Sequence, residues 1–110
     1  MSRFIVITLL LVSALSLTNS CKKASDIPGA NEVFIQGMAF SPSTITVTAG
    51  TTITWTNKDA ATHNVTSNTA LFNSPSLGKN ETYSHLFSAV GSFPYKCTIH
   101  PSMTGTVVVK

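Results

Sequence analysis

The stretch from Thr44 to Thr56 reads TITVTAGTTITWT, and apolar and polar residues alternate on both sides of a central Ala-Gly turn. Ile45 and Val47 fall on one face of the first half, and Ile53 and Trp55 fall on one face of the second. Successive residues of a β-strand point to opposite faces, so this pattern predicts two half-buried strands.

The same period continues along the chain from Glu32, and no helical period interrupts it. Gly, Pro and Asn bound the alternating stretches, as is typical of an antiparallel β-sandwich or barrel with about seven or eight short strands. We predict an all-β fold, with one domain over residues 32–110. Further strands are expected at Glu32–Ile35, His63–Thr66, Thr82–Phe87, Ser92–Cys97 and Gly105–Val109.

Length and composition exclude several classes of protein. The chain has 110 residues, of which 10% are charged, and its formal net charge is +3. Nucleic-acid binding needs a dense basic surface, so no nucleic-acid partner is expected. A hydrophobic fraction of 43% argues against disorder, and the length leaves no room for a two-domain enzyme.

The first twenty residues have the pattern of an export signal. A basic start at Met1–Arg3 precedes the apolar run Phe4–Leu17, which is too short for a transmembrane helix. Ser20-Cys21 then resembles the cleavage box of bacterial lipoproteins. We predict a lipoprotein-type signal peptide over residues 1–20, with lipid attached to Cys21. The alternative is an ordinary secretory peptide, which would leave a soluble periplasmic protein.

Residues 21–31 are polar and contain Pro28-Gly29, so they are expected to form a tether. Cys21 and Cys97 are the two cysteines. Lipidation would consume Cys21 and leave Cys97 as a free thiol in an oxidising compartment. Such a thiol is a liability unless something holds it.

Near the C-terminus, Cys97, His100 and Met103 are spaced three residues apart. A strand cannot turn all three to one side, whereas a loop containing Pro101 can. His63 is the natural fourth ligand. Two imidazoles, a thiolate and a weak axial thioether form the ligand set of one type 1 copper ion. Structural zinc sites are built from cysteine and histidine and do not include methionine.

Cys97 and the two histidines have two alternative interpretations. A buried cysteine beside surface histidines would need no metal. A Cys–His nucleophile pair would leave Met103 without a role, and the sequence shows no orienting carboxylate.

The chain resembles the cupredoxins, most closely their plastocyanin/amicyanin-like type, from Glu32 to Val109. Family motifs occur in the family's order, and the gap between His100 and Met103 matches the amicyanin-like loop. The matching residues are Phe40-Ser41-Pro42, Ile45-x-Val47-x-x-Gly50, Ile53-Thr54-Trp55-Thr56-Asn57, Asp59, His63-Asn64-Val65, Gly78, Phe87, Gly91 and Tyr95-x-Cys97-x-x-His100-Pro101-x-Met103-x-Gly105.

The resemblance implies an eight-stranded Greek-key sandwich with copper at one end. It implies that His63 is buried and that the edge of His100 reaches the surface. The Asn64 N–H would point at the Cys97 sulfur, and the Asn64 side chain would bond Thr98. Ile99 stands where the closest loops often carry proline, so its N–H is expected to be able to donate a second hydrogen bond to the sulfur.

These features predict an exported one-electron carrier and no enzyme. It would be a monomer, would touch the membrane only through its lipid anchor, and would face the periplasm. A redox protein would dock at the His100 edge; candidates are a c-type cytochrome, an oxidase, a reductase or a dehydrogenase. The alternative is a copper-handling lipoprotein that stores or delivers the metal from the same site.

Overall fold

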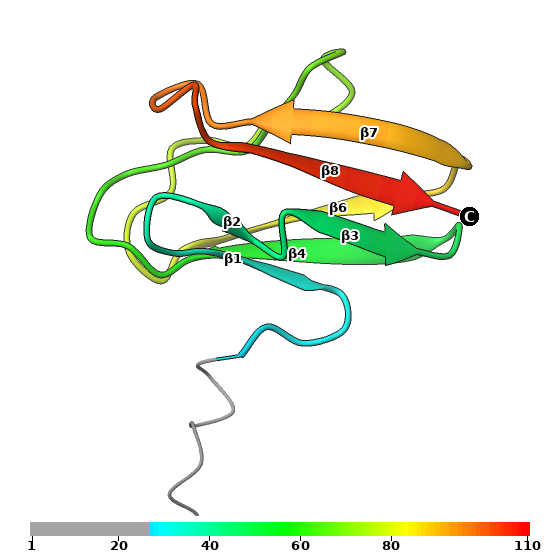
Figure 1. Ribbon diagram of the computed structural model, residues 1–110, viewed down its shortest axis with the longest axis horizontal. Coiled ribbons are helices and arrows are strands. Elements are labelled where there is room, and N and C mark those ends of the chain that lie inside the picture. The colour runs from blue at the N-terminus through cyan, green and yellow to red at the C-terminus, as the bar shows by residue number, and fades with distance from the viewer. Residues whose placement is uncertain (1–26) are drawn as a thin grey trace, which may run out of the picture.

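The computed structural model describes residues 27–110, which form eight strands in two facing sheets (Figure 1). The predicted signal peptide, Cys21 and the first part of the tether lie outside the described residues. Within the described part of the chain, no helix is long and apolar enough to cross a membrane. The strands are β1 Glu32–Ile35, β2 Phe40–Ser41, β3 Thr44–Val47, β4 Thr51–Asn57, β5 Thr66–Ser67, β6 Thr82–Phe87, β7 Gly91–Lys96 and β8 Thr104–Val109.

One sheet has the strand order β2-β1-β4-β6, and the other has the order β3-β8-β7-β5. The prediction of an all-β sandwich with about eight strands is confirmed. The expectation of purely antiparallel pairing needs correction, because β1 pairs with β4 and β3 pairs with β8 in parallel. The other four strand pairs are antiparallel.

The opening alternating stretch is divided between the two sheets. Its halves become β3 and β4, and the turn at Ala49-Gly50 carries the chain from one sheet to the other. Gly50 has φ +91°, a left-handed conformation that glycine adopts without a Cβ clash. Ile45 and Ile53 therefore face the same core from opposite layers.

Aromatic side chains fill much of the space between the sheets. Trp55 is fully buried, and its ring centroid lies 5.4 Å from that of Tyr95 and 5.8 Å from that of Phe72. Tyr95 packs edge-on against Phe40 at 4.7 Å. This packing anchors β7, the strand that leads directly into Cys97, to the centre of the molecule.

One predicted strand is displaced in the structure, one observed strand was not predicted, and the bounds of β7 and β8 differ from the prediction by one residue. The expected strand at His63–Thr66 is replaced by β5 at Thr66–Ser67, and His63 forms an isolated bridge with Leu77. The buried Asn57 side chain donates to Ala61 O and Leu77 O, so the chain bends round it before β5 begins. The short strand β2 has too few residues to show a period and was not predicted.

Candidate metal centre

Two loops meet at the end of the sandwich away from the C-terminus. One follows β4 and carries His63, and the other joins β7 to β8 and carries Cys97 and His100 (Figure 1). The backbone of Cys97 donates to Met103 O, and that of Met103 donates to His100 O, at 3.1 and 2.9 Å. These two bonds close the second loop into a tight bend.

Three donor atoms converge between these loops. The Nδ1 atoms of His63 and His100 are 3.1 Å apart, and His63 Nδ1 lies 3.8 Å from Cys97 Sγ. All three donors fall within 4.8 Å of one another. One metal ion with bonds of about 2.0 Å to nitrogen and about 2.3 Å to sulfur spans these separations. The predicted ligands are therefore brought together at bonding distance from a common point.

The donor chemistry also fits a soft metal ion. An imidazole offers its lone pair only from an unprotonated nitrogen, and two lone pairs 3.1 Å apart repel unless a cation or a proton lies between them. Cys97 is a free, fully buried cysteine among the described residues. A thiolate with two imidazoles is the in-plane ligand set of type 1 copper.

Met103 is the fourth predicted ligand, and the structure places it in the same loop. Its side chain is 4% exposed, so the thioether is buried. A weak axial thioether is typical of blue-copper sites and suits no structural zinc site.

His63 and His100 differ in their exposure. His63 is fully buried, whereas His100 is half-buried and flanked by the exposed residues Ile99 and Pro101. The structure thus agrees with the expectation that one imidazole is enclosed and the other reaches the surface. Of the two imidazoles, His100 is therefore the one in contact with solvent.

Asn64 has the role that the resemblance implied. Its N–H donates to Cys97 Sγ at 3.4 Å, and its side chain forms two hydrogen bonds with Thr98. These bonds connect the segment of His63 to that of Cys97.

The second hydrogen bond expected at the Cys97 sulfur would come from Ile99. Within residues 27–110, Asn64 supplies the one backbone N–H that bonds the Cys97 sulfur. The chain bends from Thr98 to His100 and exposes 44% of Ile99. Among the described residues the structure shows no bond from the Ile99 N–H to the sulfur, so the second donor stays a prediction.

Asp59 has no predicted role, yet it lies directly against a donor residue in the structure. Asp59 Oδ2 lies 3.0 Å from His63 Nε2. A carboxylate only accepts hydrogen bonds, so Nε2 carries the proton and Nδ1 keeps its lone pair for the metal. The spacing of four residues in an irregular loop carries no pattern from which this contact is readable.

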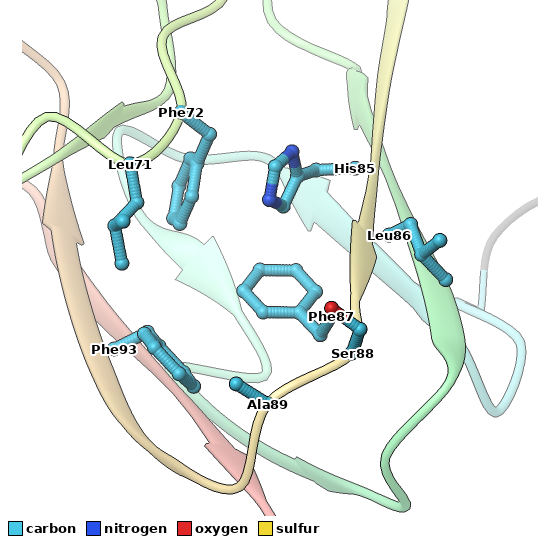
Figure 2. Close-up of a pocket in the computed structure, with 8 residues that line it drawn as sticks. All are labelled: Leu71, Phe72, His85, Leu86, Phe87, Ser88, Ala89 and Phe93. Atoms are coloured by element: carbon cyan, nitrogen blue, oxygen red, sulfur yellow. The ribbon is translucent and has the colours of Figure 1, made fainter.

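A separate hollow is lined by β6, the turn that follows it, β7 and the loop between β5 and β6 (Figure 2). Phe72, Phe87 and Phe93 line it together with His85. The His85 ring lies 4.9 Å from the rings of both Phe72 and Phe87, and burial lowers its pKa. His85 thus packs as a neutral ring among aromatic side chains, which accounts for this histidine without a metal.

Sequence comparison finds relatives over most of the chain. The profile of the Cupredoxin-like domain family matches residues 5–109. Amicyanin-alpha of Methylorubrum extorquens is 40% identical over 87 residues, which span 74% of this chain and 73% of the relative. Amicyanin of Paracoccus denitrificans is 37% identical over 87 residues, which span 74% of this chain and 66% of the relative.

Solved structures show the same fold. A copper(I) form of an amicyanin variant has a TM-score of 0.70 and 33% identity, covering 81% of this chain and 90% of that one. A novel purple cupredoxin from Nitrosopumilus maritimus has a TM-score of 0.68 and 32% identity, covering 72% of this chain and 98% of that one.

Proposed function

This chain belongs to the cupredoxin family, and on that premise we propose that it carries single electrons between redox proteins. Its His-Cys-His-Met site indicates a single type 1 copper ion, which supplies a Cu(I)/Cu(II) couple when bound. The proposed ligands are His63, Cys97, His100 and Met103.

The observation that carries the proposal is the convergence of two Nδ1 atoms and one thiol inside a rigid frame. His63 and Cys97 are fully buried. His63 Nε2–H donates a hydrogen bond to Asp59, and Cys97 Sγ accepts one from the Asn64 N–H. Ligands that are held in place rearrange little when the charge of the ion changes, and a small rearrangement favours fast electron transfer. A protein that delivers its metal would instead need ligands that open.

Each residue has a distinct part in this function. Cys97 would supply the thiolate, the buried His63 would supply one imidazole, and the half-buried His100 would supply the other and connect the centre to the surface. The exposed residues Ile99, Pro101 and Ser102 surround that exit. A small, weakly charged contact area suits short-lived redox encounters. A partner such as a c-type cytochrome, an oxidase, a reductase or a dehydrogenase would dock there.

Optical and electron paramagnetic resonance spectra of the copper-loaded protein test this function. Cys97 thiolate bound to Cu(II) should give an intense visible charge-transfer band that vanishes on reduction. Cys97→Ser should abolish the band, because a hydroxyl is a poor soft donor at neutral pH. His85→Gln removes a histidine outside the cluster and should leave the band intact. A folded Cys97→Ser variant with an undiminished band would contradict the assignment.

Electron self-exchange separates the carrier from the copper-handling alternative. A carrier should exchange electrons between its reduced and oxidised forms quickly and should retain its metal in the presence of a competing chelator. Rapid loss of copper to the chelator, together with slow self-exchange, would favour metal storage or delivery.

The proposal extends to an exported protein anchored by lipid at Cys21, with the copper domain facing the periplasm. Its support is the charge-then-apolar pattern of residues 1–20 and the Ser20-Cys21 pair. Labelling with a radioactive fatty acid tests it: the full-length chain should incorporate the label and Cys21→Ala should not. Secretion of an unlabelled soluble protein would favour the ordinary signal peptide.

A further inference from the structure

The Asp59 carboxylate joins a proposed copper ligand to a surface turn. Asp59 Oδ1 accepts the Gly37 N–H at 2.8 Å, and Oδ2 accepts the Met38 N–H at 3.0 Å. The same Oδ2 atom accepts the His63 Nε2–H at 3.0 Å. One side chain thus receives three hydrogen bonds, of which two come from a turn that is distant in sequence from His63.

The turn is built to present both of its N–H groups. Gly37 and Met38 connect β1 to β2, with φ values of +64° and +59°, and Gln36 N–H donates to Ala39 O at 2.9 Å across the base. Positive φ at both central residues is the conformation of a type I′ hairpin turn. Successive N–H groups in such a turn form a cradle for an anion, which here is the Asp59 carboxylate.

Met38 is an unusual choice for this position. A methionine in the left-handed region carries strain that glycine or asparagine would avoid. Its side chain is 45% exposed, so burial does not offset that strain. The two N–H bonds to Asp59 hold the turn in this conformation together with the Gln36–Ala39 bond across its base.

Asp59 is itself held in place by a buried residue of β4. Its N–H donates to Asn57 Oδ1 at 2.9 Å, and Asn57 is fully buried at the end of β4. The side-chain amide of Asn57 donates in turn to Ala61 O and Leu77 O. The carboxylate therefore has a defined position relative to the core.

The charge state of Asp59 agrees with this geometry. Burial pushes the pKa of the carboxyl up, but hydrogen bonds from Met38, Gly37 and His63 outweigh burial, and the pKa lies below its ordinary value. The group is a carboxylate at neutral pH and accepts from all three donors.

We propose that Asp59 is a positioning residue that fixes the Nε2–H tautomer and ring orientation of His63 and ties that ring to the Gly37-Met38 turn. The inference rests on the proposed function only in treating His63 as a copper ligand. Its consequence is that the surface turn and the buried ligand keep a constant separation. Met38, which is exposed, is thereby linked to the buried His63 through the Asp59 carboxylate.

Nuclear magnetic resonance of the metal-free protein tests the link without any need for copper. The parent should show His63 as a single Nε2–H tautomer at neutral pH, and the Gly37 and Met38 amides should be protected from hydrogen exchange. Asp59→Ala should lose the single tautomer and the protection of both amides together. Met38→Gly, which keeps both N–H groups, should retain the His63 tautomer.

Asp59→Asn provides the conservative comparison. Its single oxygen can replace Oδ2 and accept from Met38 and His63, whereas its amide group then faces the Gly37 N–H. The His63 tautomer should be largely rescued, and faster exchange should be confined to Gly37. Glu32→Gln is the charge-matched control, because Glu32 also accepts a backbone N–H, from Gly29 at 2.9 Å, but contacts no ligand. It should change neither readout.

The copper-loaded variants provide a second, independent readout. A carboxylate on Nε2 makes the imidazole a stronger donor and favours the more highly charged Cu(II). Asp59→Ala and Asp59→Asn should therefore raise the reduction potential by more than Glu32→Gln does, as measured by voltammetry.

The proposal is overturned if folded Asp59→Ala keeps the parent's His63 tautomer and the parent's exchange at Gly37 and Met38. Should that variant fail to fold, Asp59→Asn decides, and unchanged Gly37 exchange would overturn the proposal. Absence of copper binding in the parent would contradict the proposed function. The metal-free measurements would still decide whether Asp59 positions His63.

Discussion

The side chain of Asn64 is hydrogen-bonded to Thr98 at two points. Asn64 Oδ1 accepts the Thr98 N–H at 2.8 Å, and Asn64 Nδ2 donates to Thr98 Oγ1 at 2.6 Å. Since Asn64 follows His63 and Thr98 follows Cys97, the pair fixes the distance between two proposed ligands through protein contacts alone. The centre is preorganised by these contacts before any metal binds.

Asn64→Ala should weaken this connection. Asn64→Ala loses both bonds to Thr98 and the longer bond from Thr66 Oγ1, of 3.4 Å. The free energy of unfolding of the metal-free protein should fall by about 1–2 kcal/mol, because the bonds to Thr98 are exposed to water. Copper should also dissociate faster. Urea unfolding and chelator competition measure the two effects. Asn73→Ala removes only an exposed bond from Thr66 Oγ1, of 2.9 Å, and serves as the control. Equal behaviour of the two variants would contradict the connecting role.

Copper should stabilise the folded chain, because the unfolded chain has no assembled site. With free metal at about a thousand times the dissociation constant, the gain should be about 4 kcal/mol. For a domain of this size, each kcal/mol raises the melting temperature by several degrees. Calorimetry with and without copper measures the shift. Cys97→Ser should show a much smaller one, and equal melting temperatures for the parent would argue against a preformed site.

Met103→Leu should retune the centre and leave it occupied. Leucine fills a similar buried volume, so the fold should persist, and the copper should remain bound through the other three ligands. Loss of an axial donor penalises Cu(II) more than Cu(I), so the reduction potential should rise. Voltammetry and visible spectra check both points. A colourless variant would mean that Met103 is a primary ligand or is required for folding.

Tyr95 should make the metal-free protein sensitive to alkali. Burial raises the pKa of this phenol to about 12, against a smaller opposing effect of Trp55. The unfolded chain releases the proton near pH 10. The stabilising contribution is therefore complete below about pH 10 and is lost as the pH rises towards 12, by about 2–3 kcal/mol.

Urea unfolding at a series of alkaline pH values tests this dependence. Tyr95→Phe should remove the part of the decline that is due to Tyr95. It should lower the stability little at neutral pH, because the Tyr95 hydroxyl has no hydrogen-bond partner within residues 27–110. Tyr83→Phe retains Tyr95 and should keep the decline. Parallel pH profiles for the parent and Tyr95→Phe would show that the phenol does not govern it.

The sequence by itself determined which residues face the core and which atoms are available to a metal. Period-2 alternation identified β6 with its observed bounds, because the alternation of side chains is a local property of an extended backbone. The spacing of Cys97, His100 and Met103 likewise identified a ligand loop, because these donors lie within one short bend whose geometry is local.

Only the tertiary structure decided which segments become neighbours. Alternation assigns a residue to a face but names no partner strand, so neither the parallel pairing of β1 with β4 nor the separation of β3 from β4 was readable. The bonds of Asp59 to His63 and to the Gly37-Met38 turn have the same explanation. A hydrogen bond depends on distances of a few tenths of an ångström between groups that only the folded chain brings together.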